Sequence, residues 1–471
     1  MTQGQQVEWR CHPDAEAFLV KRFEPFVVEM PPLQAFAVQL YQRASGRLID
    51  WLDHVVLADG EAVRGELAEL GFEADEAPAD PGDVVYQHPG AILPRVVLRG
   101  GGRPQGRGQP RGVAPTGEVV AAAIQVEEVG HLLMAQRVAA TVEGSLLSPF
   151  RRARVWRDGN GREVLAVERR GYRGTLPTEM PADYPDRYLQ ALERWATRPR
   201  HFEDTREGME QTLMLARSLA GELGADTAAW VAFAAERIYW QQRNRAGQVQ
   251  KSRQDSLGLG WANHDHHTFR SSRDVFSVLI QILETFGFHK RERFYAGKEA
   301  GWGAQVMEQP GCRFAVFADV DLAPEEVASD FTRQPLPPRP ELGTVGLWCA
   351  LHGESMLAAG LHHLAGRFDF EAATAGLDGW GVKQLHPFSE FSYLRQAFTQ
   401  GERWPVDPER LERLAAAGLI DDKQRARFAE QGAVGSHLEN IQRGEGFKGF
   451  NQTAVSDIIR RTDPRAEQGA A

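Results

Sequence analysis

The sequence predicts an α+β protein of two similar halves, each a curved, mostly antiparallel sheet made from a pair of βαβββ units. Two observations lead to this prediction. A strand, an amphipathic helix and several further strands follow one another twice along the 471-residue chain. After each copy come a second histidine segment and a glutamate segment, so the order His…His…Glu also occurs twice. Self-similarity of this kind indicates an internal duplication.

The first copy begins with the short apolar strand "WLDHVVLA", which carries His54. The amphipathic segment that follows ends at Gly71, a common residue just past a helix because glycine tolerates left-handed backbone. The next segments, "VVYQHPGAILPRVVLRG", alternate apolar and polar residues as half-buried strands do. His131 and Glu168 lie in the later histidine and glutamate segments.

The second copy begins with "WANHDHHTFR", which holds three of the chain's 14 histidines, His266 among them. A helix is predicted from about Asp274 to the stop at Gly287, followed by strands in "GWGAQVMEQPGCRFAVFADVDL". The later segments are "GLHHLAGRF", with His363, and "GSHLENIQRGEGF", with Glu439. Both halves are therefore expected to share one architecture, with insertions in the second.

Three segments fall outside the repeated pattern. Residues 100–118 are rich in Gly, Pro and Arg and predict a mobile loop. Residues 184–250 lack strand alternation and predict two or three helices, and a helical insertion is expected at about 388–430. We accordingly divide the chain into an N-terminal βαβββ-type domain (1–180), a helical connector (181–250) and a C-terminal βαβββ-type domain (251–471).

Composition and charge exclude several classes of protein. The formal charge of −10 argues against general nucleic-acid binding. No apolar run approaches the roughly 18–20 residues of a membrane-spanning helix, and the N-terminus has no apolar signal core. Three scattered cysteines form no CxxC pair, which excludes a zinc–thiolate site and favours a reduced compartment. We expect a cytoplasmic protein without nucleic-acid or membrane partners; assembly into a homo-oligomer stays open.

His266, His363 and Glu439 are the candidate metal ligands of the second half. Two histidines and one carboxylate on one face of a metal leave three positions open, the usual arrangement of oxygen-activating non-haem iron(II). Each residue also has an ordinary alternative. A histidine on an apolar strand is more often a hydrogen-bonded core residue, and Glu439 could form a surface salt bridge with Arg443.

With these residues identified, the C-terminal half resembles the 2-oxoadipate dioxygenase/decarboxylase family of the vicinal-oxygen-chelate superfamily, whose members are built from βαβββ units. The resemblance rests on the order of "DHHTFR", "LHHLAG" and "ENIQRGEGF", and on the passage "TFGFHKRERFYAGKEAGWGAQV". It covers roughly residues 255–460. One departure is His362, where the family tends to have asparagine, so the substrate need not be 2-oxoadipate itself.

The resemblance implies that His266, His363 and Glu439 bind Fe(II), the only cofactor, and that Arg270 binds a substrate carboxylate. The implied activity is that of a non-haem iron dioxygenase/decarboxylase, which decarboxylates a 2-oxo acid oxidatively with O₂. The spacing of Arg270 from His266 is even, which puts both on one face of a strand, and a guanidinium suits a carboxylate. The ordinary alternative for Arg270 is an exposed strand-end salt bridge.

The neighbours of His266 are expected to support the ligands from an outer shell. These are His264, Asp265 and His267. The pocket should be lined by apolar and aromatic groups with few polar anchors. Residues 242–244, a Gln-Arg-Asn run just before the histidine motif, are expected at its rim.

The N-terminal half carries His54, His131 and Glu168 in analogous places, but Ala58 stands where the other copy has Arg270. We expect a degenerate half that shapes the pocket; a second working site is the alternative. Two other functions also stay open for the whole chain. One is an isomerase, lyase or hydrolase that uses another divalent metal without O₂, and the other is a metal-free small-ligand-binding protein.

Overall fold

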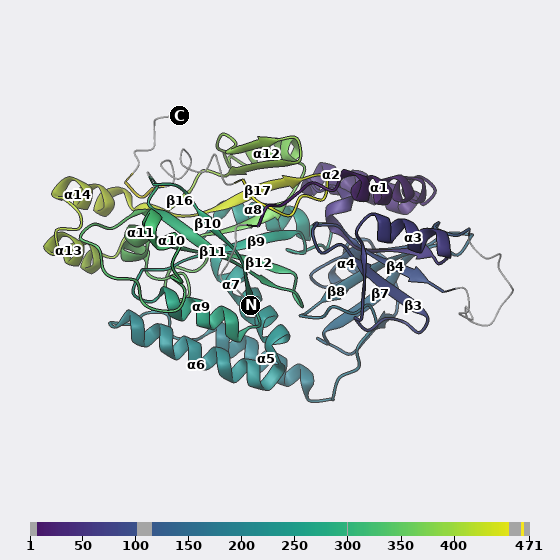
Figure 1. Cartoon of the computed structure of the whole chain (residues 1–471), viewed down its shortest axis with the longest axis horizontal. Helices are drawn as coiled ribbons and strands as arrows, with labels where there is room; N and C mark the ends of the chain where they lie inside the picture. The colour runs from purple at the N-terminus through teal and green to yellow at the C-terminus, as the bar shows by residue number, and fades with distance from the viewer. Residues whose placement is uncertain (1–6, 101–114, 299, 452–462, 466–471) are drawn as a thin grey trace.

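The computed structural model describes residues 7–100, 115–298, 300–451 and 463–465. Two large sheets lie next to one another, the first at the right of Figure 1 and the second at its centre and left. Of the predicted loop at 100–118, residues 101–114 lie outside the described residues.

The first sheet consists of two βαβββ units joined at its centre. Its strand order is β2-β3-β4-β1-β5-β8-β7-β6, with β1 and β5 antiparallel to each other. Within each unit the first and last strands pair in parallel, β1 with β4 and β5 with β8. The elements are β1 (Leu52–Ala58), α3 (Glu61–Glu69), β2 (Glu73–Asp75), β3 (Asp83–Gln87), β4 (Arg95–Arg99), β5 (Val119–Gln125), α4 (Val129–Ala135), β6 (Val142–Glu143), β7 (Phe150–Arg157) and β8 (Glu163–Arg169).

The second sheet repeats this plan in the order β10-β11-β12-β9-β13-β17-β15-β14, and β16 (Glu402–Trp404) is added against β17. β9 and β13 are antiparallel at the centre, and each pairs in parallel with the last strand of its unit. This topology confirms the predicted fold class. The elements are β9 (His264–Arg270), α9 (Phe276–Thr285), β10 (His289–Tyr295), β11 (Trp302–Gln309), β12 (Phe314–Asp321), β13 (His363–Arg367), α12 (Phe370–Asp378), β14 (Ser389–Phe391), β15 (Leu394–Phe398) and β17 (Ala433–Arg443).

All seven residues of β9 are buried, because both faces of this central strand are covered. On one face His267 and Phe269 pack against Phe233 of α7 (Ala225–Gln241), with ring centroids 5.0 and 5.6 Å apart. The other face carries His266 and Arg270. A strand that is polar on one side and completely buried indicates that the polar side faces an internal site.

The helices fall into three groups. α1 (Pro13–Val28) and α2 (Pro31–Ala44) lie over the first sheet (Figure 1); sequence patterns did not reveal them, although each has proline in its first turn, where no amide donor is needed. The connector region forms four helices where two or three were expected. These are α5 (Tyr184–Ala196), α6 (Thr205–Leu223), α7 and α8 (Arg245–Asp255), and the second half adds α10 (Pro324–Val327) and α11 (Thr344–His352).

The helical insertion expected at about 388–430 is wrong over its first part. Strands β14, β15 and β16 occupy residues 389–404, and only α13 (Pro408–Ala416) and α14 (Asp422–Gln431) are helical. The strands form because β15 pairs with β17 along five residues and with β14 in a tight hairpin. Pairing to a distant strand thus overrides the local pattern.

None of the helices described here is both long and apolar enough to cross a membrane.

Candidate metal centre

Strand register brings His266, His363 and Glu439 to one face of the second sheet. Ala365 on β13 stands opposite His266 on β9 and opposite Glu439 on β17. Directly opposed residues point to the same side, and His363, two residues before Ala365, shares that side. The three side chains therefore meet over the central strands.

The donor atoms of this triad converge. Nε2 of His266 lies 3.0 Å from Oε2 of Glu439, and Nε2 of His363 lies 3.2 Å from the same oxygen. The two Nε2 atoms are 3.4 Å apart. Donors at about 2.0–2.2 Å from one ion on adjacent octahedral positions are separated by roughly 3 Å. The spacing therefore fits a single divalent metal, and the donor set of two imidazoles and a carboxylate suits iron(II).

The triad is buried, with Glu439 1% exposed. A surface salt bridge is therefore excluded for Glu439. Burial alone would lower the pKa of His266, but the Glu439 and Asp265 carboxylates raise it to about 9. Burial lowers the pKa of His363 to about 4, although Glu439 opposes this. Burial would raise the pKa of Glu439, and the two imidazoles instead hold it well below its usual range. The carboxylate is thus ionised and ready to bind a cation.

Asp265 takes the expected outer-shell position. Its Oδ1 lies 3.0 Å from Nδ1 of His266, which leaves Nε2 of that ring facing the triad. Arg443 holds Asp265 in turn, its Nε donating to Oδ2 at 2.7 Å. Gln396 on β15 donates to Oε1 of Glu439 at 2.8 Å. Partners of this kind fix ring orientation and ligand basicity.

His264 and His267 do not take the outer-shell position predicted for them. Their rings pack against Phe314, 5.0 and 5.2 Å away between centroids. Nδ1 of His264 lies 2.8 Å from the Trp261 carbonyl, and Nε2 of His267 lies 3.4 Å from Nη1 of Arg237. Both are core histidines, because the strand alternation and a shift of register near the start of β9 turn them away from the triad.

A small cavity of about 70 Å³ adjoins the triad. Aromatic side chains make up much of its wall, as predicted, but four polar residues also line it besides the triad. Besides the triad, the lining residues are Thr268, Phe294, Trp302, Phe317, Asp319, Phe388, Gln396, Phe398, Phe450 and Asn451.

Arg270 is buried on the triad's side of β9, opposite Asp319 of β12. The exposed salt bridge considered for Arg270 is therefore excluded. Nε of Arg270 lies 3.8 Å from Oδ2 of Asp319, beyond hydrogen-bonding distance. Among the described residues, Nε and Nη1 of Arg270 and Oδ1 of Asp319 have no hydrogen-bond partner. Burial raises the pKa of Asp319 to about 7, although Arg270 and His266 lower it. Asp319, not Arg270, lines the cavity directly.

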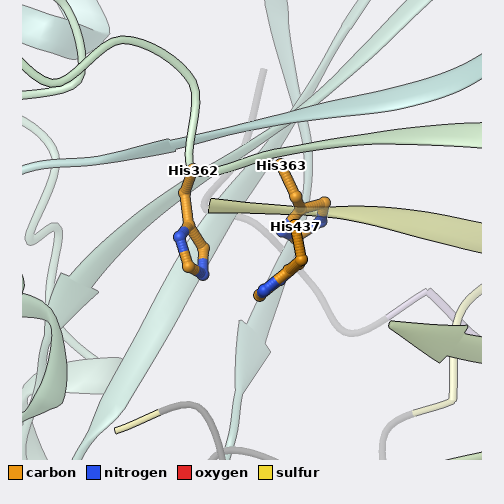
Figure 2. Close-up of side chains that lie close together, drawn as sticks. All are labelled: His362, His363 and His437. Carbon is orange, nitrogen blue, oxygen red and sulfur yellow. The ribbon is translucent and has the colours of Figure 1, made fainter. Parts of the chain in front are cut away.

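Figure 2 shows a second histidine cluster that shares His363 with the triad. Donor atoms of His362, His363 and His437 lie within 4.8 Å of one another. His437 stands opposite His363 in the pairing of β13 with β17. This cluster has no carboxylate, and the nearby charge of Arg270 lowers the pKa of all three imidazoles after burial has done so. The triad suits a cation better, because it contains the carboxylate of Glu439.

Within the part of the first half that the structure describes, no equivalent triad is assembled. His54 on β1 stands opposite Ala123, and Ala123 stands opposite Leu165 on β8. The position equivalent to Glu439 is therefore Leu165, three residues from Glu168, and the position equivalent to His363 is Ala121.

The other first-half candidates have different surroundings. Glu168 accepts from Arg170 at 2.7 Å and Arg151 at 2.8 Å, and His131 is exposed on α4. His54 lies 2.6 Å from Asp53. Among the described residues, these three do not come together as the second working site considered for them would require, because register and not sequence order decides which residues meet.

Sequence patterns missed three residues of the site. Thr268 Oγ1 lies 2.8 Å from Nε2 of His363, and its even spacing from His266 would have indicated it. Asp319 and Gln396 come from strands whose sequences carry no comparable signal. The run at 242–244 was wrongly expected at the rim: Arg243 donates to the Ala358 and Ala359 carbonyls and does not line the cavity.

No protein-family model matches the chain, and no curated protein matches it. Several solved structures are similar in fold. Hydroxyglutarate synthase from Oryza sativa, in complex with 2-oxoadipate, is 11% identical over 52% of this chain and 94% of that one, with a TM-score of 0.35. A 4-hydroxymandelate synthase mutant from Streptomyces coelicolor is 14% identical over 87% and 96%, with a TM-score of 0.25. Methylmalonyl-CoA epimerase from Mycobacterium tuberculosis is 13% identical over 39% and 89%, with a TM-score of 0.23.

Proposed function

We propose that the chain is an iron(II)-dependent dioxygenase that oxidatively decarboxylates a 2-oxo acid similar to 2-oxoadipate. One observation supports this above all. Two imidazole nitrogens and a carboxylate oxygen converge to within 3.4 Å beside a mainly aromatic cavity. The motif resemblance points to the same three residues and to the same reaction class.

His266, His363 and Glu439 would hold the metal and leave its other positions facing the cavity. When bound, iron(II) supplies Lewis-acid polarisation of a 2-oxo group and the one-electron chemistry that O₂ requires. Asp265 keeps the His266 ring in the orientation that presents Nε2, and Gln396 restrains Glu439. The aromatic side chains make the wall apolar, and displacement of water from such a wall by the substrate would strengthen electrostatic interactions inside the site.

Arg270 and Asp319 would receive the distal carboxylate of the substrate. Their unpartnered atoms lie within a buried region next to the cavity. With its pKa near 7, Asp319 can hold a proton and donate it in a hydrogen bond to a carboxylate oxygen. The guanidinium of Arg270 would supply the compensating charge. This arrangement favours a dicarboxylic 2-oxo acid over a monocarboxylic one.

The test is an assay of the iron-loaded protein with 2-oxoadipate, in air and under argon. We expect about one iron per chain, and CO₂ release with matching O₂ consumption in air only. His266→Ala and Glu439→Ala should lose both iron and turnover. His131→Ala, which removes an exposed histidine, should retain both.

Two results would refute the proposal and identify its alternatives. Turnover of a related substrate under argon, with another divalent metal, would indicate an isomerase, lyase or hydrolase. Absence of metal binding in wild type, with retained affinity for small ligands, would indicate a binding protein.

A further inference from the structure

A second, larger cavity of about 290 Å³ lies between the two halves. Its volume is close to the lower bound of ordinary small-molecule sites. The first sheet contributes Gln87, Arg95 and Gln125 to its wall, and the second contributes Asp265 and Ala315. The two cavities have no lining residue in common, so this cavity is separate from the aromatic cavity beside the triad.

The wall of this cavity is strongly basic. Among the described residues that line it, the acids are Asp265 and Glu308, and both already have cationic partners. Arg443 holds Asp265 at 2.7 Å, and Lys448 lies 2.9 Å from Glu308. The cationic lining residues are Arg95, Arg173, Arg291, Arg313, Arg367 and Lys448.

Three of these cations lack a carboxylate partner. Arg173 pairs with Asp75 and Arg291 with Glu292. Within the described ranges, by contrast, no ion pair involves Arg95, Arg313 or Arg367. Arg95 is 3% exposed, and its Nη1 has no hydrogen-bond partner among the described residues. Nε of Arg367 also has no hydrogen-bond partner among these residues. Arg313 donates to the Leu93 carbonyl at 3.2 Å.

Asp53, whose charge acts on Arg95, is already engaged by other groups. Asp53 accepts from Nε and Nη2 of Arg169 at 2.5 and 2.7 Å, and its Oδ2 lies 2.6 Å from Nδ1 of His54. Burial and the charges of Arg169 and Arg313 lower the pKa of Arg95 well below its usual value, despite Asp53. Unpaired buried charge of this kind is costly, and a ligand of opposite charge would relieve the cost.

We infer that this cavity is an oxyanion-binding site, which takes a phosphate or carboxylate group of a small molecule between Arg95, Arg313 and Arg367. Planar guanidinium groups bind both kinds of oxyanion through paired N–H donors. The site uses no metal, so it is independent of the proposed dioxygenase activity. It also gives the first sheet a role, because Arg95 stands opposite His54 on β1, where the second sheet has Ala315 opposite His266.

The basic cavity is next to Asp265, the residue that orients His266 in the candidate metal centre. Asp265 lines the cavity and also contacts His266. An anion held by the three arginines would therefore share a cavity with the aspartate that contacts His266.

The experiment is calorimetric titration of the metal-free full-length protein with inorganic phosphate and, separately, with succinate, at constant ionic strength. Wild type should bind about one equivalent of at least one probe. Arg95→Met and Arg313→Met should weaken that binding about 10- to 100-fold, the usual effect of losing a charged hydrogen bond. Arg194→Met, at an exposed arginine paired with Glu222, is the matched control and should bind like wild type.

The two probes identify the ligand class, since preference for phosphate indicates a phosphorylated ligand and preference for succinate a carboxylic acid. Succinate binding should survive Arg270→Ala, which separates this cavity from the aromatic one. Without anions, Arg95→Met should melt no lower than wild type, because it removes an unpaired buried charge. Failure of both probes to bind wild type, unchanged binding by Arg95→Met, or a much lower melting temperature of that variant in anion-free buffer would each overturn the inference.

Discussion

At the scale of single residues, each of the two ring nitrogens of His266 faces a different carboxylate. Nδ1 faces Asp265 and Nε2 faces Glu439, both at 3.0 Å. The two carboxylates raise the pKa of the ring against the effect of burial. In the metal-free protein this imidazole is therefore protonated at neutral pH, and it must lose that proton to become a ligand.

Metal affinity should consequently depend on pH. The pKa of His266 is raised to about 9 and that of His363 is lowered to about 4. Between pH 6.5 and 8.5, metal binding must therefore displace one proton, the one on His266. We expect the affinity for iron(II) to rise about tenfold per pH unit over this range and to level off above pH 9. Competition titrations under argon would measure it. An affinity that does not change with pH would show that His266 is not a ligand.

Arg270→Ala should separate substrate binding from metal binding. Iron should remain bound, because the guanidinium is not a ligand. Affinity for 2-oxoadipate should fall by about 2–5 kcal/mol, the usual cost of leaving a desolvated charge without its partner. A 2-oxo acid without the distal carboxylate should lose far less. Steady-state kinetics with both substrates and iron analysis of the variant would test this, and loss of iron would contradict the assigned role.

At the scale of elements, α7 is attached to the segment before β13 through a buried carboxylate. Glu236 of α7 is 1% exposed and accepts from Arg200 and from Trp195, each at 2.8 Å. Arg198 also pairs with it at 2.8 Å. The same arginines donate to the carbonyls of Met356 and Leu357. The position of the chain that leads to His363 thus depends on this cluster.

Glu236→Ala should destabilise the protein strongly. It would leave two buried guanidinium groups without their acid, which costs about 3–5 kcal/mol. Urea unfolding followed by circular dichroism would measure the change. Glu193→Ala, on the exposed face of α5, should change the stability by less than about 0.5 kcal/mol. Similar values for both variants would mean that the cluster contributes no more than a surface acid.

At the scale of the whole molecule, the two halves share their cores. Leu257, Leu259 and Ala262 belong to the second half by sequence, yet they pack into the core of the first half. β9 begins at His264, two positions after Ala262. The first core therefore fixes the start of the strand that carries His266. The basic cavity between the sheets, with walls from both halves, is a second link of this kind.

Leu259→Ala should therefore lower the stability of both halves together. Leu259 is completely buried, and its truncation should cost about 2–5 kcal/mol. Unfolding monitored by tryptophan fluorescence and by release of bound metal should give one coincident transition at lower denaturant. Leu189→Ala, at a half-exposed leucine of α5, is the control. Metal release that stays at the wild-type denaturant concentration would show that the halves unfold independently.

Local sequence patterns were sufficient to predict the repeated architecture of this chain. Strand alternation, helix periodicity and glycine stops repeat over short windows, and they depend on backbone geometry that neighbouring residues set among themselves. The two-half fold followed from them, as did the shared face of His266 and Arg270. The helices α1 and α2 were missed because no matching copy marks them, and strands at 389–404 formed because β17 pairs with them.

Only the tertiary structure decided which residues meet. His363 and Glu439 join His266 because β13 and β17 pair with a register that aligns Ala365 with both partners. In the first half the same register selects Leu165 instead of Glu168. A shift of one residue would turn a side chain to the other face, and the order of histidines and glutamates along a sequence contains no information about register. The sequence alone therefore determined the architecture and the chemistry of the candidate ligands, while strand pairing decided where a triad can form.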